Sequence, residues 1–128
     1  MRKPMEIRDA HFPGRAPIDS YGNGGFRFAD MSHRGSLLML PSGIYGWDAA
    51  EGDALTVDLF QRVFSETAPI EFFLVGTGKD IRPIPAPLKA RFRAMNMSSD
   101  PMSTGAAVRT YNIMLAESRA VAACLIAV

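Results

Sequence analysis

The sequence predicts an α/β fold: one three-layer domain whose mixed central sheet is built from an N-terminal β-meander and a following α-β-α-β-α-β alternation. The chain has 128 residues, and single domains commonly hold ~100–150. Hydrophobic residues make up 48% and charged residues 21% of the chain, which is ordinary for a folded globular protein. Near residue 55 the apolar spacing changes from short segments between turn residues to helical spacing and buried runs.

Residues 1–25 are predicted to form an irregular N-terminal arm, and residues 26–128 are predicted to form the α/β domain. Three prolines and four glycines interrupt any regular pattern in the arm. No apolar segment follows the first charged residues, so no secretory signal is expected. We therefore expect a cytoplasmic protein, and we expect a bacterial one because no transit segment rich in arginine and serine precedes the domain.

Three short apolar segments form the predicted meander: FRFADM from Phe26, GSLLMLPSG from Gly35 and IYGWD from Ile44. Glycine, proline and serine separate these segments at the spacing of neighbouring antiparallel strands. From Leu55 onwards the spacing predicts a helix over residues 55–66, capped by Thr56 or Asp53. The apolar face of this helix consists of Leu59, Phe60, Val63 and Phe64.

The remaining chain alternates strands and helices. The run IEFFLV (70–75) predicts a strand covered on both faces. Residues 85–96 predict a helix with Leu88, Phe92 and Met95 on its buried side. The segment MSSDPM predicts a short strand or crossover, and the stretch after it predicts a helix behind a Ser or Thr cap. The final run RAVAACLIAV predicts another buried strand, which contains the single cysteine.

A glycine-threonine-glycine turn, Gly76–Thr77–Gly78, ends the strand IEFFLV and resembles loops that hold phosphates. A dinucleotide-binding fingerprint needs a third glycine where Ile81 stands, and a P-loop needs serine or threonine where Asp80 stands. Neither nucleotide signature is complete. The turn is either a strand-ending corner that uses glycine for a positive φ, which we favour, or a loop that holds a ligand.

A second candidate corner is the helix start at Ser103, because the free N–H groups at a helix N-terminus attract anions. Carboxyl ends of neighbouring parallel strands open onto one sheet edge, so this helix start and the turn at Gly76 are expected to face one crevice. Either an anion binds there with help from Arg109, or Ser103 only caps the helix while Arg109 and Asn112 tie loops down. We favour the second interpretation.

We recognise no catalytic constellation, and we expect neither a metal site nor a cofactor. Both histidines lack partners at metal-ligand spacing. The acidic loop around Trp47, with Asp48, Glu51 and Asp53, is expected to be only solvated. A net charge of +1 provides no broad basic field for nucleic acid. No run approaches the ~18 apolar residues of a transmembrane helix.

Four motifs together resemble a known family: GSLLMLPSGIYGW, APIEFFLVGTG, MSTGAAVRTYNIML and RAVAACLI. It is a family of small domains of unknown function that includes the mitochondrial NADH dehydrogenase (ubiquinone) complex I assembly factor 3. The resemblance spans roughly Phe26 to Ala127. It implies a three-layer α/β domain. It also points to binding, because the mitochondrial member is known as an assembly factor that works bound to a related one.

The resemblance implies candidate ligand- or partner-binding residues in the turn and in the motif helix. Together with the helix start, they are Gly76, Thr77, Gly78, Met102, Ser103, Thr104, Arg109 and Asn112. Ser118 departs from the family pattern, which often has glycine there. The function expected is a non-enzymatic protein-interaction module, whose partner is an assembly factor or a respiratory complex subunit. The alternative is a small anionic-ligand binder or an enzyme that uses the expected crevice.

Overall fold

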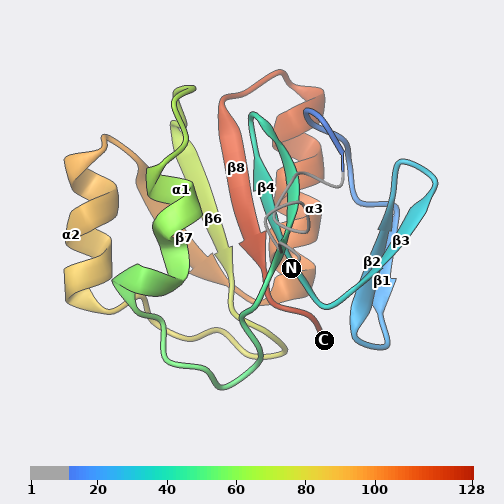
Figure 1. Ribbon diagram of the computed structural model, residues 1–128, viewed down its shortest axis with the longest axis horizontal. Coiled ribbons are helices and arrows are strands. Elements are labelled where there is room, and N and C mark those ends of the chain that lie inside the picture. Colours follow the sequence, from blue (N-terminus) through green and yellow to red (C-terminus); the bar gives the residue numbers. More distant parts are fainter. Residues whose placement is uncertain (1–11) are drawn as a thin grey trace, which may run out of the picture.

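A five-stranded mixed sheet forms the centre of the protein, in a computed structural model that describes residues 12–128 (Figure 1). The strands lie in the order β5-β4-β8-β6-β7. Their bounds are β4 (Ser36–Leu40), β5 (Gly43–Trp47), β6 (Phe72–Gly76), β7 (Ser98–Met102) and β8 (Val121–Leu125). Because β6 pairs in parallel with β7 and β8, while β4 runs antiparallel to β5 and β8, the predicted mixed sheet is confirmed.

Four of these strands point in the same direction, because β5 is antiparallel to β4 and β4 is antiparallel to β8. The carboxyl ends of β5, β6, β7 and β8 therefore open onto one edge of the sheet, which lies at the bottom of Figure 1. The loops and helices that follow these strands consequently begin at one edge.

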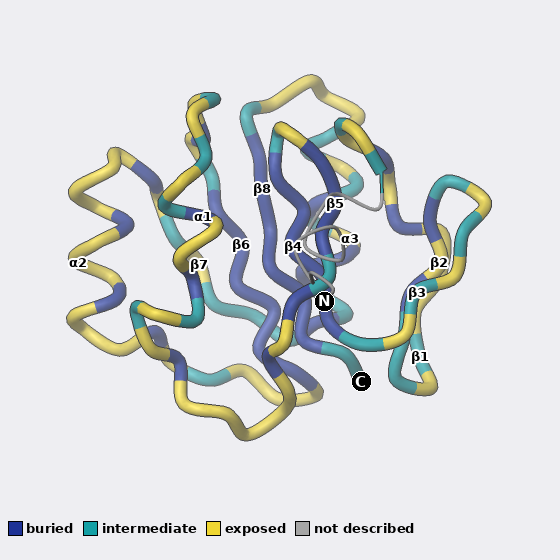
Figure 2. Tube along the Cα trace, in the orientation of Figure 1, coloured by how far each residue is buried: buried dark blue, intermediate teal, exposed yellow. Residues whose placement is uncertain are grey.

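Three layers are present, as the sequence predicts. A 3₁₀ turn η2 (Val57–Phe60), α1 (Gln61–Phe64) and α2 (Ala86–Ala94) cover one face. The other face is covered by α3 (Thr104–Ala116) and by a small second sheet. Leu38 and Leu40 belong to one hydrophobic cluster, whereas Leu37 and Met39 belong to the other. This alternation is the two-residue period of a strand buried on both sides, and Figure 2 shows the central strands as the buried part of the molecule.

The second sheet is antiparallel and has the order β1-β2-β3, with β1 (Ser20–Gly22), β2 (Gly25–Phe28) and β3 (Met31–Arg34). The predicted meander is therefore distributed over two sheets, and β1 lies within the predicted arm. The chain changes sheets at Gly35, whose φ of +98° favours glycine. Predictions for residues 1–11 lie outside the described residues.

The predicted helices occur in the predicted order, but their lengths differ from the prediction. The helix expected over residues 55–66 is a 3₁₀ turn followed by a single α turn. Thr56 caps the 3₁₀ turn, and no side chain caps the α turn at Phe60. Met95 lies beyond the end of α2 and is exposed, which corrects its predicted place on the buried face. Cys124 and Trp47 belong to the core.

Helix α3 ends with a left-handed residue that is not glycine. Ser118 has a φ of +60°, which an L side chain adopts at a cost of ~1–2 kcal/mol. Two backbone bonds close this end: Ser118 N–H donates to Leu115 O at 2.9 Å, and Arg119 N–H donates to Met114 O at 3.0 Å. This is the helix-ending arrangement in which glycine is usual, so the strain at Ser118 follows from the departure noted in the sequence.

We predict that Ser118→Gly raises the free energy of unfolding by about 1 kcal/mol, because glycine relieves the left-handed strain. Urea unfolding followed by circular dichroism measures the change. Ser65→Gly is the matched control, since Ser65 follows α1 with an ordinary φ of −86°; glycine there should lower stability. A Ser118→Gly protein no more stable than the wild type would contradict the prediction.

Candidate functional site

Thr104 joins three parts of the chain at the sheet edge. Its side-chain Oγ1 accepts a hydrogen bond from Gly78 N–H at 3.0 Å and donates one to Ile126 O at 2.6 Å. Its own backbone N–H donates to Gly78 O at 2.8 Å. Thr104 is 0% exposed. The turn after β6, the start of α3 and the segment after β8 are thus held together by one buried hydroxyl.

Thr77 shapes the turn itself. Its Oγ1 accepts from Arg82 N–H at 3.0 Å and lies 2.7 Å from Asp80 O and 3.2 Å from Met102 O. A hydroxyl has one proton to donate, so the shorter contact to Asp80 is the stronger bond. The backbone N–H of Thr77 donates to Met102 O at 2.9 Å. The turn is therefore bonded both to itself and to the end of β7.

Ser36 makes the third buried hydroxyl junction. Its Oγ donates to Ala49 O at 2.7 Å and accepts from Ala127 N–H at 2.8 Å. It connects the start of β4, the loop after β5 and the segment after β8. Ser36, Thr77 and Thr104 are the buried polar residues of the described chain, and all three act at this edge.

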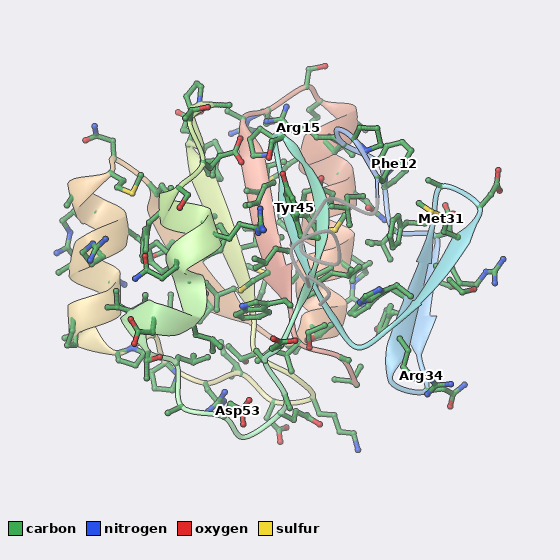
Figure 3. All side chains as sticks on the ribbon, viewed as in Figure 1. Phe12, Arg15, Met31, Arg34, Tyr45 and Asp53 are labelled. Atoms are coloured by element: carbon green, nitrogen blue, oxygen red, sulfur yellow. The ribbon has the colours of Figure 1, made fainter. Side chains whose placement is uncertain are left out.

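A carboxylate of the chain itself occupies the outer side of the glycine turn. Glu51 Oε2 accepts from Lys79 N–H at 2.6 Å. Gly78 has a φ of +110°, and a Cβ at that position would lie 2.6 Å from Glu51 Cγ. In the same loop, which Figure 3 shows around Asp53, the backbone oxygen of Asp53 accepts from Arg82 Nη2 at 2.9 Å. Glu51, which we expected to be only solvated, therefore packs on the turn and bonds it.

These contacts decide what the turn can do chemically. The N–H groups of Thr77, Gly78 and Lys79 donate to Met102 O, Thr104 Oγ1 and Glu51 Oε2 respectively. A loop that holds a phosphate leaves such N–H groups free for the anion. At Gly76 the absence of a side chain allows the backbone of β8 to pack closely, because a Cβ there would lie 3.0 Å from Cys124 O. The turn binds the rest of the chain through groups that a phosphate loop would offer to a ligand.

The structure brings six of the eight predicted residues to this edge and leaves two further along α3. Ser103 caps the helix, with Oγ accepting from Ala106 N–H at 3.3 Å. Arg109 is exposed. Asn112 holds the segment before β1, since its Oδ1 accepts from Ile18 N–H and its Nδ2 donates to Ile18 O, both at 2.9 Å. A role in ligand or partner binding stays a prediction for all eight.

Tyr111 is a residue of the motif helix α3. It is completely buried, and its hydroxyl has no hydrogen-bond partner within residues 12–128. Burial raises the pKa of Tyr111 to about 12, and the positive charge of Arg15 opposes part of that rise. Burial likewise raises the pKa of the Cys124 thiol. Both groups are therefore neutral at physiological pH.

From Phe12 onwards, no three histidine, cysteine, aspartate or glutamate side chains gather in a way that could hold a metal ion. Within the same residues, no helix has both the length and the apolar character needed to cross a membrane.

The fold places this protein in the class of small α/β domains with a mixed sheet. Buried hydroxyl groups form hydrogen bonds between the chain segments at the carboxyl edge of that sheet. Residues 18–126 match the family described as "Protein of unknown function (DUF498/DUF598)", and the chain belongs to this family. The resemblance seen in the sequence is thereby confirmed.

Two relatives and one solved structure illustrate the similarity. An uncharacterized protein of Rhodobacter capsulatus is 35% identical over 122 residues, covering 95% of this chain and 93% of that protein. NADH dehydrogenase [ubiquinone] 1 alpha subcomplex assembly factor 3 of Mus musculus is 25% identical over 125 residues, covering 98% of this chain and 68% of that protein. The protein in a crystal structure described as an outer membrane protein from Bartonella henselae is 57% identical in sequence, with a TM-score of 0.86. The match covers 91% of this chain and 98% of that protein.

We predict that Thr104→Val lowers the free energy of unfolding by about 2–3 kcal/mol. Valine keeps the shape of threonine but leaves Gly78 N–H and Ile126 O buried without their partner. Chemical denaturation measures the loss. The matched control is Thr110→Val in the same helix, at a half-buried position, which should change stability far less. Equal effects of the two substitutions would show that the Thr104 hydroxyl does not hold the edge.

We predict that Tyr111→Phe keeps or raises stability at neutral pH, by up to about 1 kcal/mol, because it removes a buried hydroxyl without a partner. The same substitution should flatten the alkaline loss of stability. The phenol keeps its proton in the folded protein up to a pKa of about 12, above the ordinary 10.0, so folding stability is lost as pH rises between those values. Unfolding measured from pH 7 to 12 tests both points. A destabilised variant at pH 7 would contradict the first.

Proposed function

We propose that this protein is a non-enzymatic protein-interaction module that assists the assembly of a larger complex. The partners proposed are subunits of a respiratory NADH dehydrogenase or other assembly factors. The names of the mammalian relatives support this class of partner. The proposal includes the cytoplasmic location predicted from the sequence.

The observation that carries the proposal is the bonding of the sheet edge to itself. Small ligands of α/β domains commonly bind at the carboxyl ends of parallel strands. In this protein Thr104, Thr77 and Glu51 take up the N–H groups of the turn there. Recognition by the outer surface is therefore favoured over chemistry in a crevice.

Helix α3 offers a surface for such recognition. Ile113 is 60% exposed, and Arg109 is exposed one turn earlier on the same helix. Arginine is enriched at protein interfaces, and an exposed apolar side chain gains free energy when a partner covers it. Asn112, between them in sequence, fastens the segment before β1 to this helix, so the helix and that segment present a connected surface.

The alternative, a small anionic-ligand binder or an enzyme at the turn, requires the Glu51 carboxylate to leave Lys79 N–H. A ligand present at 100-fold its Kd would stabilise the protein by ~2.7 kcal/mol. A thermal-shift screen of anions and nucleotides therefore separates the two functions. A ligand at the turn should stabilise Glu51→Gln more than wild type, because the neutral amide competes less strongly for Lys79 N–H than the carboxylate does; such a ligand would support the alternative.

We predict that affinity capture of the tagged protein from native cells, after gentle detergent solubilisation, enriches NADH dehydrogenase subunits or their assembly proteins. Ile113→Glu should reduce this recovery at least about fivefold, because a buried contact is replaced by a charge. Arg93→Gln on α2, across the sheet from α3, is the control and should recover the wild-type set. Quantitative mass spectrometry provides the measurement. Recovery of the same proteins with the tag alone would refute the proposal.

A further inference from the structure

The small sheet β1-β2-β3 has a hollow on one face that the proposed α3 surface does not include. Its volume is about 530 Å³, and residues of all three strands line it. Arg27 and Arg34 are among its lining residues, and no carboxylate is found among the described residues that line it. Figure 3 shows Arg34 at the end of this sheet, away from the central sheet.

Strand register explains why the sheet is hollow there. Gly22, Gly25 and Arg34 form one row across the three strands. Arg27 and Ser32 belong to the next row on the same face, because residues two apart on a strand point the same way. Two paired glycines leave the first row without side chains over β1 and β2. Gly25 cannot be replaced easily, since a Cβ there would lie 2.5 Å from His33 O.

The two sides of this sheet have opposite character. Phe26 and Phe28 alternate with Arg27 along β2 and are buried in the core beneath α3. Arg27 and Arg34 are exposed on the side of the hollow. Arg27 Nη1 donates to Ser32 Oγ at 2.6 Å, which orients the guanidinium. Within residues 12–128, neither of these arginines forms an ion pair.

The end of the hollow is held in place by the main chain. Gly24 N–H, in the turn between β1 and β2, donates to Val128 O at 2.7 Å, and Gly35 N–H donates to Gly24 O at 2.7 Å. These bonds attach the β1-β2 turn to the end of β3 and to the segment after β8. The glycine floor is therefore positioned before any ligand arrives, which reduces the entropy lost on binding.

We propose that this hollow binds an extended acidic segment of a partner protein, with carboxylates that accept hydrogen bonds from Arg27 and Arg34. The inference rests on the proposed function as a protein-interaction module and assigns a second surface to it. Arg27 and Arg34 stand on adjacent strands two residues apart in register, a separation of ~7–8 Å. Carboxylates at alternate positions of an extended chain are spaced by ~6.5–7 Å, so one segment reaches both arginines.

The shape of the hollow favours a peptide over a single phosphate. A phosphate site usually surrounds its ion with several converging donors, whereas this hollow is open and extends over three strands. Arginine is among the residues enriched where protein segments bind.

The test uses fluorescence anisotropy of a short labelled peptide that has glutamate at every second position, and of a matched peptide with glutamine instead. At low salt, the glutamate peptide should bind about tenfold more tightly than the glutamine peptide, and added salt should weaken it. Arg27→Gln and Arg34→Gln should each weaken binding about fivefold. Arg93→Gln on α2, equally exposed, is the control and should bind as wild type does.

Three results would overturn the inference: equal affinity for both peptides, binding unaffected by both arginine substitutions, or displacement of the peptide by inorganic phosphate at equal concentration. Circular dichroism checks that the variants are folded. Partner capture with the Arg27→Gln/Arg34→Gln variant separates this inference from the proposed function. If the double variant still captures the partners, and the glutamate peptide does not bind wild type, the acidic-segment site is wrong and the assembly role stands. If capture fails for wild type while the peptide binds, the assembly role is wrong and the site stands.

Discussion

The hydrogen bonds of the Thr104 hydroxyl are the interaction on which the arrangement of this protein depends. Four strands end at one edge of the central sheet, and each leaves a chain segment with backbone groups that no strand pairs. Thr104 Oγ1 satisfies Gly78 N–H and Ile126 O at once. Buried backbone groups without partners are expensive, so this single oxygen holds the turn, the helix start and the C-terminal segment in one geometry.

The same bonds explain why a motif that looks like a ligand loop has a different use here. The glycines of the turn permit close approach, and what approaches is the chain itself: Glu51 at Gly78, and the backbone of β8 at Gly76. A carboxylate from the loop after β5 bonds Lys79 N–H, in the place that a bound anion takes in phosphate loops. The glycines of this turn thus serve packing and hydrogen bonding within the chain.

The order of elements was predictable, because apolar periodicity survives in each segment: β4 and β8 are buried along their whole length, and α3 buries Ala107, Val108 and Tyr111. Proximity of the turn and the helix start followed from the rule that parallel strands end at one edge. The role of Glu51 did not follow, since its loop comes after a strand three places away from β6 in the sheet. Nothing local marks an acidic loop residue as the partner of a distant N–H group.

The sequence alone determined the class of fold, the buried strands and the family, because these depend on local spacing and on short motifs. Only the tertiary structure decided that the meander divides at Gly35 between two sheets. It also decided that three hydroxyls and one carboxylate bond the carboxyl edge, and that Arg27 and Arg34 flank a row of glycines. The physical reason is that hydrogen bonds and charge pairs form between atoms brought close by strand order and register, and neither quantity is written in any one segment of the chain.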